Sequence, residues 1–491
     1  MSDKFRTINR DTPFLLPPSL QDWLPEDHLA RFVVDIVDRL DLSALERDYG
    51  GGGKHPYHPA VLLSLLFYGY ATGVFSSRKL EQATYDSVAF RFITADTHPD
   101  HDTIATFRRR FLREIEGLFV QVLGIAQELG FLKLGHVSVD GTKIKANASK
   151  HKAMSWGYAN RLEEQLRGEV ASLLAQAEAA DAQDEPAMDI PEELARREDR
   201  LAAIAKAKAQ IEQRARERFE AEQAEYEAKL EQRKAREEKT GGKPPGNPPK
   251  PPQPGPRDRD QVNFTDEESR IMPSAEGFVQ AYNARAVVAL DSHLIVANHL
   301  TQQPNDKQQV VAALAGLEAL ETQPDGLLAD SGYFSEDNVA RCEAAGITPL
   351  IATAREKHNQ PLLERYQAPP RPPEEADALA RMKHRLKTPE GKASYARSKS
   401  PVETVFGIIK HAMGFRQFHL RGKAAVQGEW NLVSLAWNLK RMFALAGERS
   451  QGQSAGGKPA HPCATFFIVT VGGLLNMPAQ ATSADSNPTD A

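Results

Sequence analysis

Three acidic residues that lie far apart in the sequence, Asp140, Asp330 and Glu403, stand at positions where carboxylates can act together. Asp140 follows the apolar run VSV, and Asp330 follows the apolar run GLLA. Both runs are typical of buried strands, and the functional groups of α/β sheets gather where strands end. Glu403 falls in the first turn of a helix predicted at 401–412. We therefore expect the fold to bring the three carboxylates to one site.

Carboxylates grouped in this way suit a hard divalent cation. Mg²⁺ prefers oxygen ligands and is usually held by a few carboxylates while it keeps water or substrate oxygens. Two such ions could activate the attacking oxygen of a phosphodiester displacement and stabilise the leaving oxygen. This chemistry requires no Cys, Ser–His or Lys nucleophile from the protein.

Each acid also has a purely local explanation. Asp140 and Asp330 begin the sequences DG and DSG, which are typical of turns. The run SPVE at 400–403 is a capping box, in which Glu403 stabilises the start of its own helix. Capping and metal binding do not exclude one another, so both explanations stay open for these residues.

The charge around the acids favours a phosphodiester substrate. Between Lys383 and Lys423 there are ten Lys or Arg residues and only two acids, Glu390 and Glu403. Cations in such a stretch can hold a nucleic-acid backbone. The whole chain carries a net charge of −5, but residues 161–240 contribute −6 and the rest of the chain contributes +1. The acidic total therefore does not argue against a nucleic-acid partner.

Hydrophobic periodicity predicts the elements that position these groups. Residues 12–130 indicate an all-helical module, with one helix at 103–128 capped by Asp102 or Thr103. Once 150–270 is removed, the remaining order is β, β, β, α, β, α, β, α, which is the order of an RNase H-like mixed sheet of the α/β class. The strands are expected at about 137–146, 284–290, 293–298, 326–330 and 347–352, and the helices at 306–320, 336–345, 401–412 and 424–446.

Residues 155–260 are expected to form a long charged helical insertion followed by a Pro-rich linker. Apolar residues recur at roughly heptad spacing through 161–239, which predicts a helical hairpin or a coiled coil. The segment 244–256 holds eight prolines in thirteen positions, so we expect an extended linker and not a packed element. The insertion could dimerise, or it could only stand beside the active site. Residues 447–491 are expected to be a disordered tail.

Three segments resemble the DDE transposases of bacterial insertion sequences. They are SVDGTKIKANASKHKA at 138–153, LLADSGYFSEDN at 327–338, and the stretch at 395–442 that begins YARSKSPVETVFGIIK. Residues 16–43 resemble the helical domain that precedes the catalytic domain in one branch of these enzymes. The resemblance implies an RNase H-like catalytic domain at 131–446.

This resemblance also implies roles for individual residues. Asp140, Asp330 and Glu403 would form the metal-binding catalytic triad, with two Mg²⁺ or Mn²⁺ ions. Many of these enzymes carry the signature Y-x2-R-x3-E-x6-K around the third acid. Lys410 fits the signature, Lys399 takes the Arg position, and Tyr395 stands one residue early, with Arg397 between them. The implied DNA-binding residues are Lys399, Lys410, Arg397, Arg416 and Tyr395.

The implied activity is cleavage of DNA at the ends of an insertion sequence and transfer of the cut strand to target DNA. Its partners would be terminal inverted repeats and target DNA, and the protein would form a homo-oligomer when DNA is bound. A metal-dependent nuclease without strand transfer and an inactive DNA-binding remnant are the alternatives.

The helical module at 12–130 is the expected DNA-end-binding domain. Arg108, Arg109 and Arg110 could touch phosphates there, or they could be the solvated face of an amphipathic helix. Trp430 and Trp437 are two helical turns apart and are expected to pack in the core.

A chain of 491 residues predicts two or three domains. Its two cysteines, Cys342 and Cys463, argue against a disulfide framework or a Cys-rich zinc site and favour a reducing compartment. Neither a secretory signal nor a membrane span is expected, because the start is polar and the apolar runs are short. We expect a cytoplasmic protein, in the bacterial cytosol or nucleoid.

Overall fold

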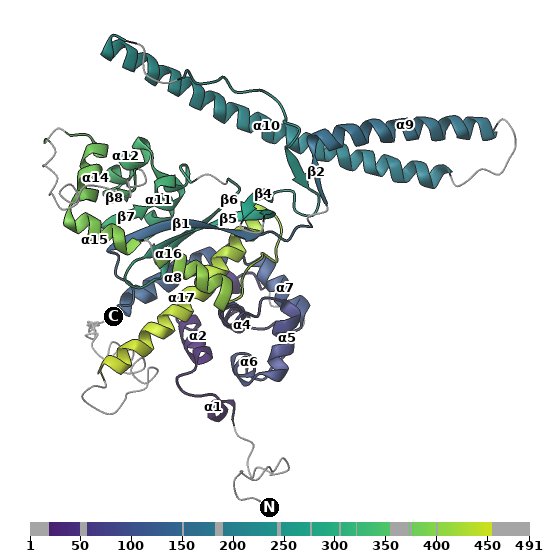
Figure 1. Ribbon diagram of the computed structural model, residues 1–491. Helices are drawn as coiled ribbons and strands as arrows, with labels where there is room; N and C mark the ends of the chain where they lie inside the picture. Colours follow the sequence, from purple (N-terminus) through teal and green to yellow (C-terminus); the bar gives the residue numbers. More distant parts are fainter. Residues whose placement is uncertain are drawn as a thin grey trace, which may run out of the picture. The chain divides into compact units, whose positions relative to one another are not determined.

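The computed structural model shows a mixed α/β protein (Figure 1). It describes residues 19–49, 56–149, 152–181, 190–242, 247–274, 277–303, 306–320, 322–353, 373, 376–398 and 401–453. The disordered tail expected at 447–491 therefore lies almost entirely outside the described residues, as does Lys399.

The described residues include a six-stranded sheet, in which the strands follow the order β4-β5-β1-β7-β8 and β6 also pairs with β5. β1 runs parallel to β7, and β7 runs parallel to β8. β5 and β6 are joined through the expected turn near Asp291, where the N–H of Ala289 donates to the carbonyl of Leu294 at 2.9 Å. The strands are β1 His136–Lys145, β4 Arg270–Ser274, β5 Gly277–Ala289, β6 Ile295–Thr301, β7 Gly326–Ala329 and β8 Thr348–Ile351.

Helices alternate with the later strands as the sequence predicts. Ser335 caps the second of these helices through the N–H of Asn338, and Gly346, with a φ of 74°, follows its end. The π-helix η3 continues directly from α16, so the two together match the helix expected at 401–412. The bounds are α11 Gln309–Glu318, α12 Glu336–Ala344, α14 Ala378–Lys387, α15 Pro389–Ser398, α16 Pro401–Gly407, η3 Ile408–Ala412 and α17 Lys423–Gln453.

The described residues between 20 and 128 contain helices and no strand. The prediction of one helix at 103–128 was wrong, because the chain turns at 111–113 between α7 and α8. This turn places Phe111 in the core beside Phe107 and Tyr49. The cap is Asp100, which accepts a hydrogen bond from the N–H of Thr103 at 2.8 Å. The bounds are α1 Leu20–Trp23, α2 Leu29–Val37, α3 Ser43–Glu46, α4 Pro59–Thr72, α5 Ser77–Asp86, α6 Val88–Ile93, α7 His101–Arg110 and α8 Glu114–Glu128.

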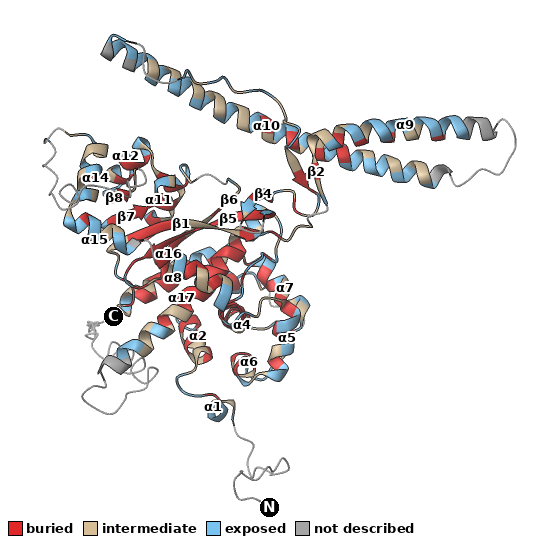
Figure 2. Cartoon of the chain, viewed as in Figure 1, coloured by how far each residue is buried: buried red, intermediate tan, exposed pale blue. Residues whose placement is uncertain are grey.

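The strands β5 to β8 and the helices α4 and α17 carry long runs of buried residues (Figure 2). Trp430 and Trp437 are both buried, as expected. Their indole N–H groups donate to the carbonyls of Arg285 and His293, each at 2.9 Å. These bonds tie α17 to the strand β5 and to the turn that follows it, so the long helix supports the centre of the sheet.

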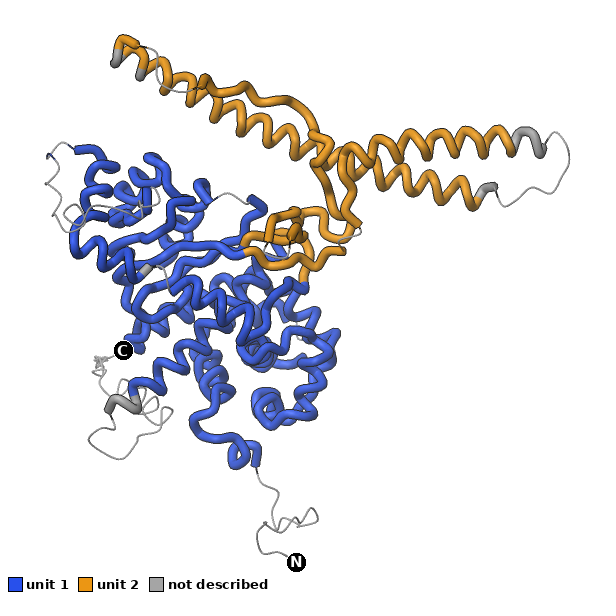
Figure 3. Tube along the Cα trace, viewed as in Figure 1, with its two compact units in different colours: residues 1–142, 284–419, 424–491 blue, residues 143–283, 420–423 orange. Residues whose placement is uncertain are grey.

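The chain divides into two compact units, and the division falls inside β1 and β5 (Figure 3). Unit 1 contains residues 1–142, 284–419 and 424–491, and unit 2 contains 143–283 and 420–423. The acidic residues singled out from the sequence all belong to unit 1.

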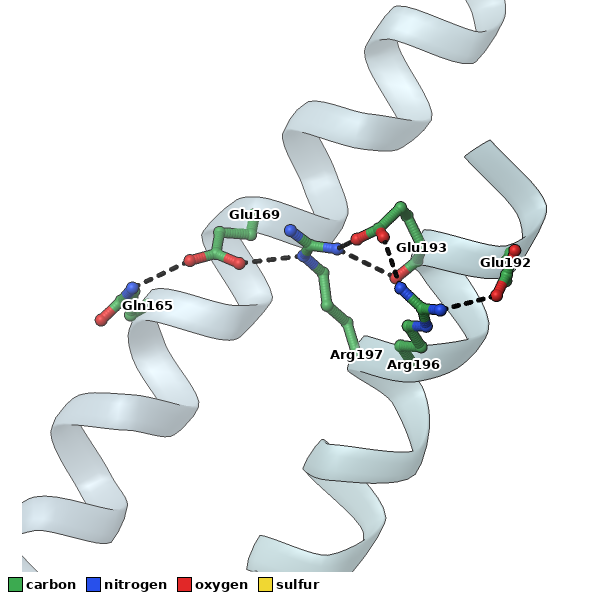
Figure 4. Close-up of polar contacts among 6 residues, drawn as sticks. All are labelled: Gln165, Glu169, Glu192, Glu193, Arg196 and Arg197. Carbon is green, nitrogen blue, oxygen red and sulfur yellow. Dashed lines mark hydrogen bonds and ion pairs between the residues drawn. The ribbon is translucent and has the colours of Figure 1, made fainter. Parts of the chain in front are cut away.

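Unit 2 is built on two long helices, α9 Trp156–Asp181 and α10 Ile190–Thr240, which pack against each other as a hairpin. Apolar side chains near its base, among them Leu162, Leu166 and Ile204, form a small core. Ion pairs join the helices further out, where Arg197 contacts Glu169 at 2.9 Å across the hairpin (Figure 4). The short strands β2 Ala153–Ser155 and β3 Gln261–Asn263 close its base as an antiparallel pair.

The described part of the Pro-rich segment is extended, and none of its residues is buried, but it is hydrogen-bonded to α10. Two arginines of α10 donate to its carbonyls, Arg233 to Asn247 at 3.2 Å and Arg218 to Gly255 at 3.1 Å. Both accepting carbonyls belong to residues that precede a proline, and the prolines of this segment offer no N–H donors of their own.

Within the described residues, no single helix has both the length and the apolar composition needed to cross a membrane. One pair of helices, α4 and α5, meets the length and composition test only when taken together, and it is bent by 96°.

Candidate active site

Asp140 lies on β1, and Asp330 directly follows β7, the parallel neighbour of β1. β1 pairs with β7 in a register that places Ser138 beside Leu328. Asp140 comes two residues after Ser138, Asp330 comes two residues after Leu328, and the charge of Asp330 acts on the Asp140 carboxyl. Asp140 and Asp330 are 190 residues apart in the sequence, and the pairing of β1 with β7 brings their segments side by side.

The Asp140 carboxyl lies in an environment that disfavours its charge. Loss of hydration on burial raises its pKa from 3.8 to about 6, and the negative charges of Asp330 and Asp306 act in the same direction. The N–H of Gly141, 2.6 Å from the carboxylate, and the guanidinium of Arg285 oppose the shift. Because the opposing groups do not compensate, the Asp140 carboxyl holds its proton more strongly than an exposed aspartate does.

Asp330 is exposed and also caps a short turn, η2 Ser331–Tyr333. One of its carboxylate oxygens accepts a hydrogen bond from the N–H of Gly332 at 2.8 Å. The turn that the DSG sequence predicts is therefore present, and it orients the carboxylate at the end of β7.

Arg285 is a fully buried cation that the sequence reasoning missed. It lies on β5 with only 1% of its surface exposed. The guanidinium donates to the hydroxyl of Tyr333 and pairs with Asp306. One signal was available in the sequence, because Arg285 is the only charged residue within the otherwise mostly apolar strand run AYNARAVVAL.

Asp306 is a third carboxylate close to this pair of acids, and sequence reasoning missed it as well. A Cβ built on Gly332 would lie 2.9 Å from an oxygen of Asp306 and 3.0 Å from an oxygen of Asp330. Asp306 precedes α11 in the polar run TQQPNDKQQ, which gives no periodic signal. Only the folded chain shows that it belongs to the site.

Glu403 is exposed in the first turn of α16 and is not among the groups that perturb Asp140. The same helical stretch nevertheless approaches the strand of Asp140, because Lys410 donates to the hydroxyl of Thr142. Burial lowers the pKa of Lys410. The structure thus brings Asp330 close to Asp140 and Lys410 close to Thr142 on the same strand, and Glu403 is not among the charges that act on Asp140.

No three His, Cys, Asp or Glu side chains form a group that could hold a metal ion, as far as the described residues extend. The acids nearest to that arrangement are Asp140, Asp330 and Asp306, of which Asp306 is already paired with Arg285.

The basic residues implied as DNA contacts lie in different surroundings. Arg397 is exposed at the end of α15 and pairs with Asp291, while Tyr395 of the same helix is half-buried. Arg416 is exposed and donates through Nε to the carbonyl of Lys410 at 3.1 Å. Lys399 lies outside the described residues.

Arg108 cannot touch a phosphate, because it is buried. It donates to the hydroxyl of Tyr70 at 3.1 Å and to the carbonyl of Phe75 at 3.0 Å. Arg110 pairs with Asp48 at 3.0 Å, and Arg109 is exposed. The explanation of this basic run as a purely solvated face is therefore wrong for Arg108.

Gly141 has no room for a side chain, which leads to a prediction. A Cβ at this position would lie 2.5 Å from Cδ and 2.6 Å from Nε of the buried Arg285. We expect Gly141→Ala to lower the free energy of unfolding by about 1–3 kcal/mol, measured by urea denaturation. Gly117→Ala is the control, because Gly117 is exposed on α8 with nothing near its Cβ. Equal stability of the two variants would contradict this packing.

The fold and the acidic pair define an α/β protein with a candidate acidic site at the ends of parallel strands. Comparison with known protein families gives two matches. Residues 18–110 match a transposase domain (DUF772), and residues 251–439 match a transposase DDE domain. No curated protein and no solved structure matches the chain.

The two matched segments together cover more than half of the chain, and both belong to transposases. The chain is therefore a member of the DDE transposases of insertion elements, and its function is transposition. The second segment includes Asp330 and Glu403 but begins after β1, so it does not include Asp140.

Proposed function

We propose that this transposase cuts DNA at the ends of its insertion sequence and joins the freed 3′-hydroxyl to target DNA by divalent-metal phosphodiester chemistry. The observation that carries the proposal is the parallel pairing of β1 with β7, together with the effect of the Asp330 charge on the Asp140 carboxyl. Two neighbouring carboxylates, one of them half-buried with a raised pKa, suit a site that holds a cation during the reaction.

The strand order supports an RNase H-like core for the catalytic domain at 131–446. Read outward from β1, β5 and then β6 lie on one side, and β7 and then β8 lie on the other. This arrangement carries one acid on the central strand and the second acid directly after its parallel neighbour. The proposed domain layout keeps 12–130 as the DNA-end-binding domain and 155–260 as an insertion within the catalytic domain.

The residues present fit Mg²⁺ or Mn²⁺. The donors are carboxylate oxygens, which are the ligands such ions prefer, and Asp140 lacks a positive partner strong enough to offset its burial. Asp140, Asp330 and Glu403 would hold the ions, two of them in the full site. When bound, the ions supply charge stabilisation for the attacking and leaving oxygens.

The protein's own groups then bind and orient the DNA. Lys410 lies beside Thr142, two residues after Asp140, so its ammonium group is placed to contact a phosphate next to the acids. Arg416 is exposed and bonded to the carbonyl of Lys410, so it extends the basic surface from the same segment. Tyr395, Arg397 and Lys399 are the further proposed contacts on the preceding segment.

The partners proposed on this basis are the terminal inverted repeats and target DNA. Assembly of two ends requires two copies of the active site to meet on DNA, so we propose a homo-oligomer in the DNA-bound state.

The test is cleavage and joining in vitro, with the full chain and DNA that carries the element's ends. We expect cut and joined products with Mg²⁺, and none with EDTA or with Asp330→Asn. Asp337→Asn is the matched control, because Asp337 is an exposed acid that pairs with Arg341 on the surface of α12. Activity in EDTA, or full activity of Asp330→Asn, would overturn the proposal.

The same assay separates the alternatives. Cleavage without joined product would favour a nuclease, and binding of end DNA without cleavage would favour an inactive remnant.

A further inference from the structure

Arg285 carries a charge into the interior of the protein, next to the acids of the candidate site. A guanidinium that is almost completely buried has lost its hydration, so it requires close partners for its charge and its donors. The backbone around it is fixed by Trp430, which donates to the carbonyl of Arg285 at 2.9 Å. The backbone of Arg285 is therefore held by α17 in the core, while the partners of its guanidinium lie beside Asp330.

The two partners of Arg285 hold opposite ends of the guanidinium. Tyr333 accepts a hydrogen bond from one terminal nitrogen, and the guanidinium carbon lies 5.4 Å from the centre of its ring. Asp306 pairs with the other terminal nitrogen. The third nitrogen, Nε, has no hydrogen-bond partner in the described part of the chain.

This unpartnered Nε faces the strand of Asp140. The Nε and the neighbouring carbon atoms of Arg285 lie against Gly141, close enough to exclude a Cβ there. Asp140 is the nearest acid on that strand, and Arg285 is one of the charges that affect it. The guanidinium therefore has two acids within electrostatic reach, but only Asp306 is bonded to it.

We propose that Asp306 is a positioning residue that occupies the buried Arg285 and thereby keeps Asp140 and Asp330 available for a divalent cation. Three acids and one arginine leave a net charge of −2 in this group, so the group attracts a divalent cation. Without the Asp306 carboxylate, Arg285 would turn to Asp140 as its next partner and would compete with the cation. The inference rests on the proposed function, because it assumes that Asp140 and Asp330 bind the ion.

The test is Mn²⁺ binding to the full chain without DNA, followed by electron paramagnetic resonance of the free ion. We expect Asp306→Asn to weaken Mn²⁺ binding by about tenfold or more. An Arg that pairs with a carboxylate lowers its pKa by about 1–3, so the freed Arg285 should weaken the hold of Asp140 on another cation by a comparable factor. Tyr333→Phe is the matched control, since it removes the other partner of Arg285 without changing the charge. It is expected to bind Mn²⁺ as the wild type does.

The double variant Asp306→Asn/Arg285→Gln separates a positioning role from a direct one. It restores the net charge of −2, so we expect Mn²⁺ affinity within about threefold of the wild type. Weak binding in the double variant would overturn the proposal, because Asp306 would then be needed even when Arg285 is absent. The double variant gives this answer even if Asp306→Asn alone fails to fold, which circular dichroism would reveal.

Asp330→Asn is measured in parallel to keep the two proposals distinct. If Asp330→Asn binds Mn²⁺ as the wild type does, the proposed cation site itself is wrong. If it loses binding while Asp306→Asn keeps it, the cation site stands and the positioning role of Asp306 is wrong.

Discussion

Replacing Asp140 with asparagine is expected to lower the rate of DNA cleavage by about a thousandfold or more, while it stabilises the metal-free protein at neutral pH. The loss of rate follows because a lost metal ligand removes several kcal/mol of transition-state stabilisation. The gain in stability follows from the burial of the carboxyl, since a neutral amide avoids both the lost hydration and the repulsion from Asp330 and Asp306. Cleavage assays and urea denaturation in EDTA measure the two effects.

The gain in stability has a defined dependence on pH. The folded protein binds a proton on Asp140 with a pKa of about 6, whereas the ordinary value of 3.8 applies to the unfolded chain. As pH rises from 3.8 to about 6, the unfolded chain releases this proton first, so the free energy of unfolding falls by up to about 3 kcal/mol. Asparagine has no proton to release, so the free energy of unfolding of the variant does not decrease in this way.

The difference in the free energy of unfolding between wild type and Asp140→Asn should therefore grow as pH rises from 3.8 to about 6, and it should stay constant above pH 6. Asp337→Asn is the control, because Asp337 is an exposed acid that pairs with Arg341 on the surface of α12. Identical pH profiles for wild type and Asp140→Asn in EDTA would show that Asp140 is not buried as described.

Glu429→Ala is the substitution with the largest expected effect on stability. Glu429 is completely buried and accepts hydrogen bonds from the hydroxyl of Tyr70 at 3.0 Å and from the backbone N–H of His419 at 2.9 Å. Arg108 in turn donates to Tyr70. Removing the carboxylate leaves these donors unsatisfied and Arg108 without a nearby anion, so we expect a loss of about 3–5 kcal/mol.

The control for this variant is Glu448→Ala. Glu448 lies on the same helix and pairs with Arg441, but its side chain is 61% exposed. Its removal should cost less than about 1 kcal/mol. Urea denaturation that gave equal stabilities for the two variants would refute the role of the buried network.

The Glu429 network also connects the two segments that match transposase families. Tyr70 and Arg108 come from residues 18–110, and Glu429 and His419 come from residues 251–439. Because the network lies inside unit 1, the helical module and the sheet share one core. Glu429→Ala is thus expected to destabilise both segments in a single transition.

The pair of acids could be predicted from sequence because the signal was local. Asp140 and Asp330 each follow an apolar run that alternates or is short enough to be a strand, and strand ends are where α/β sheets expose functional groups. The order of the elements along the chain followed from the same periodicity. The pairing of β1 with β7 joins residues 190 positions apart, such as His136 and Gly326, and only the structure shows it.

Arg285 and Asp306 could not be predicted in the same way. Their pairing depends on how β5 and the loop before α11 approach each other, and no spacing in the sequence reports that contact. Arg108 was misjudged for a similar reason. A basic run at the end of a helix resembles a solvated face, but Arg108 is buried and donates a hydrogen bond to the buried hydroxyl of Tyr70.

The central claim is that Asp140 and Asp330 hold the same cation, and affinity cleavage tests it most directly. Fe²⁺ bound in place of Mg²⁺, with ascorbate and peroxide, cuts the protein backbone close to the ion, and mass spectrometry locates the cuts. We predict cuts near Asp140 and near Asp330, with both lost in Asp330→Asn, and a third near Glu403 if that residue completes the site. Cuts elsewhere in the chain, or a cut near Asp140 that persists in Asp330→Asn, would contradict the claim.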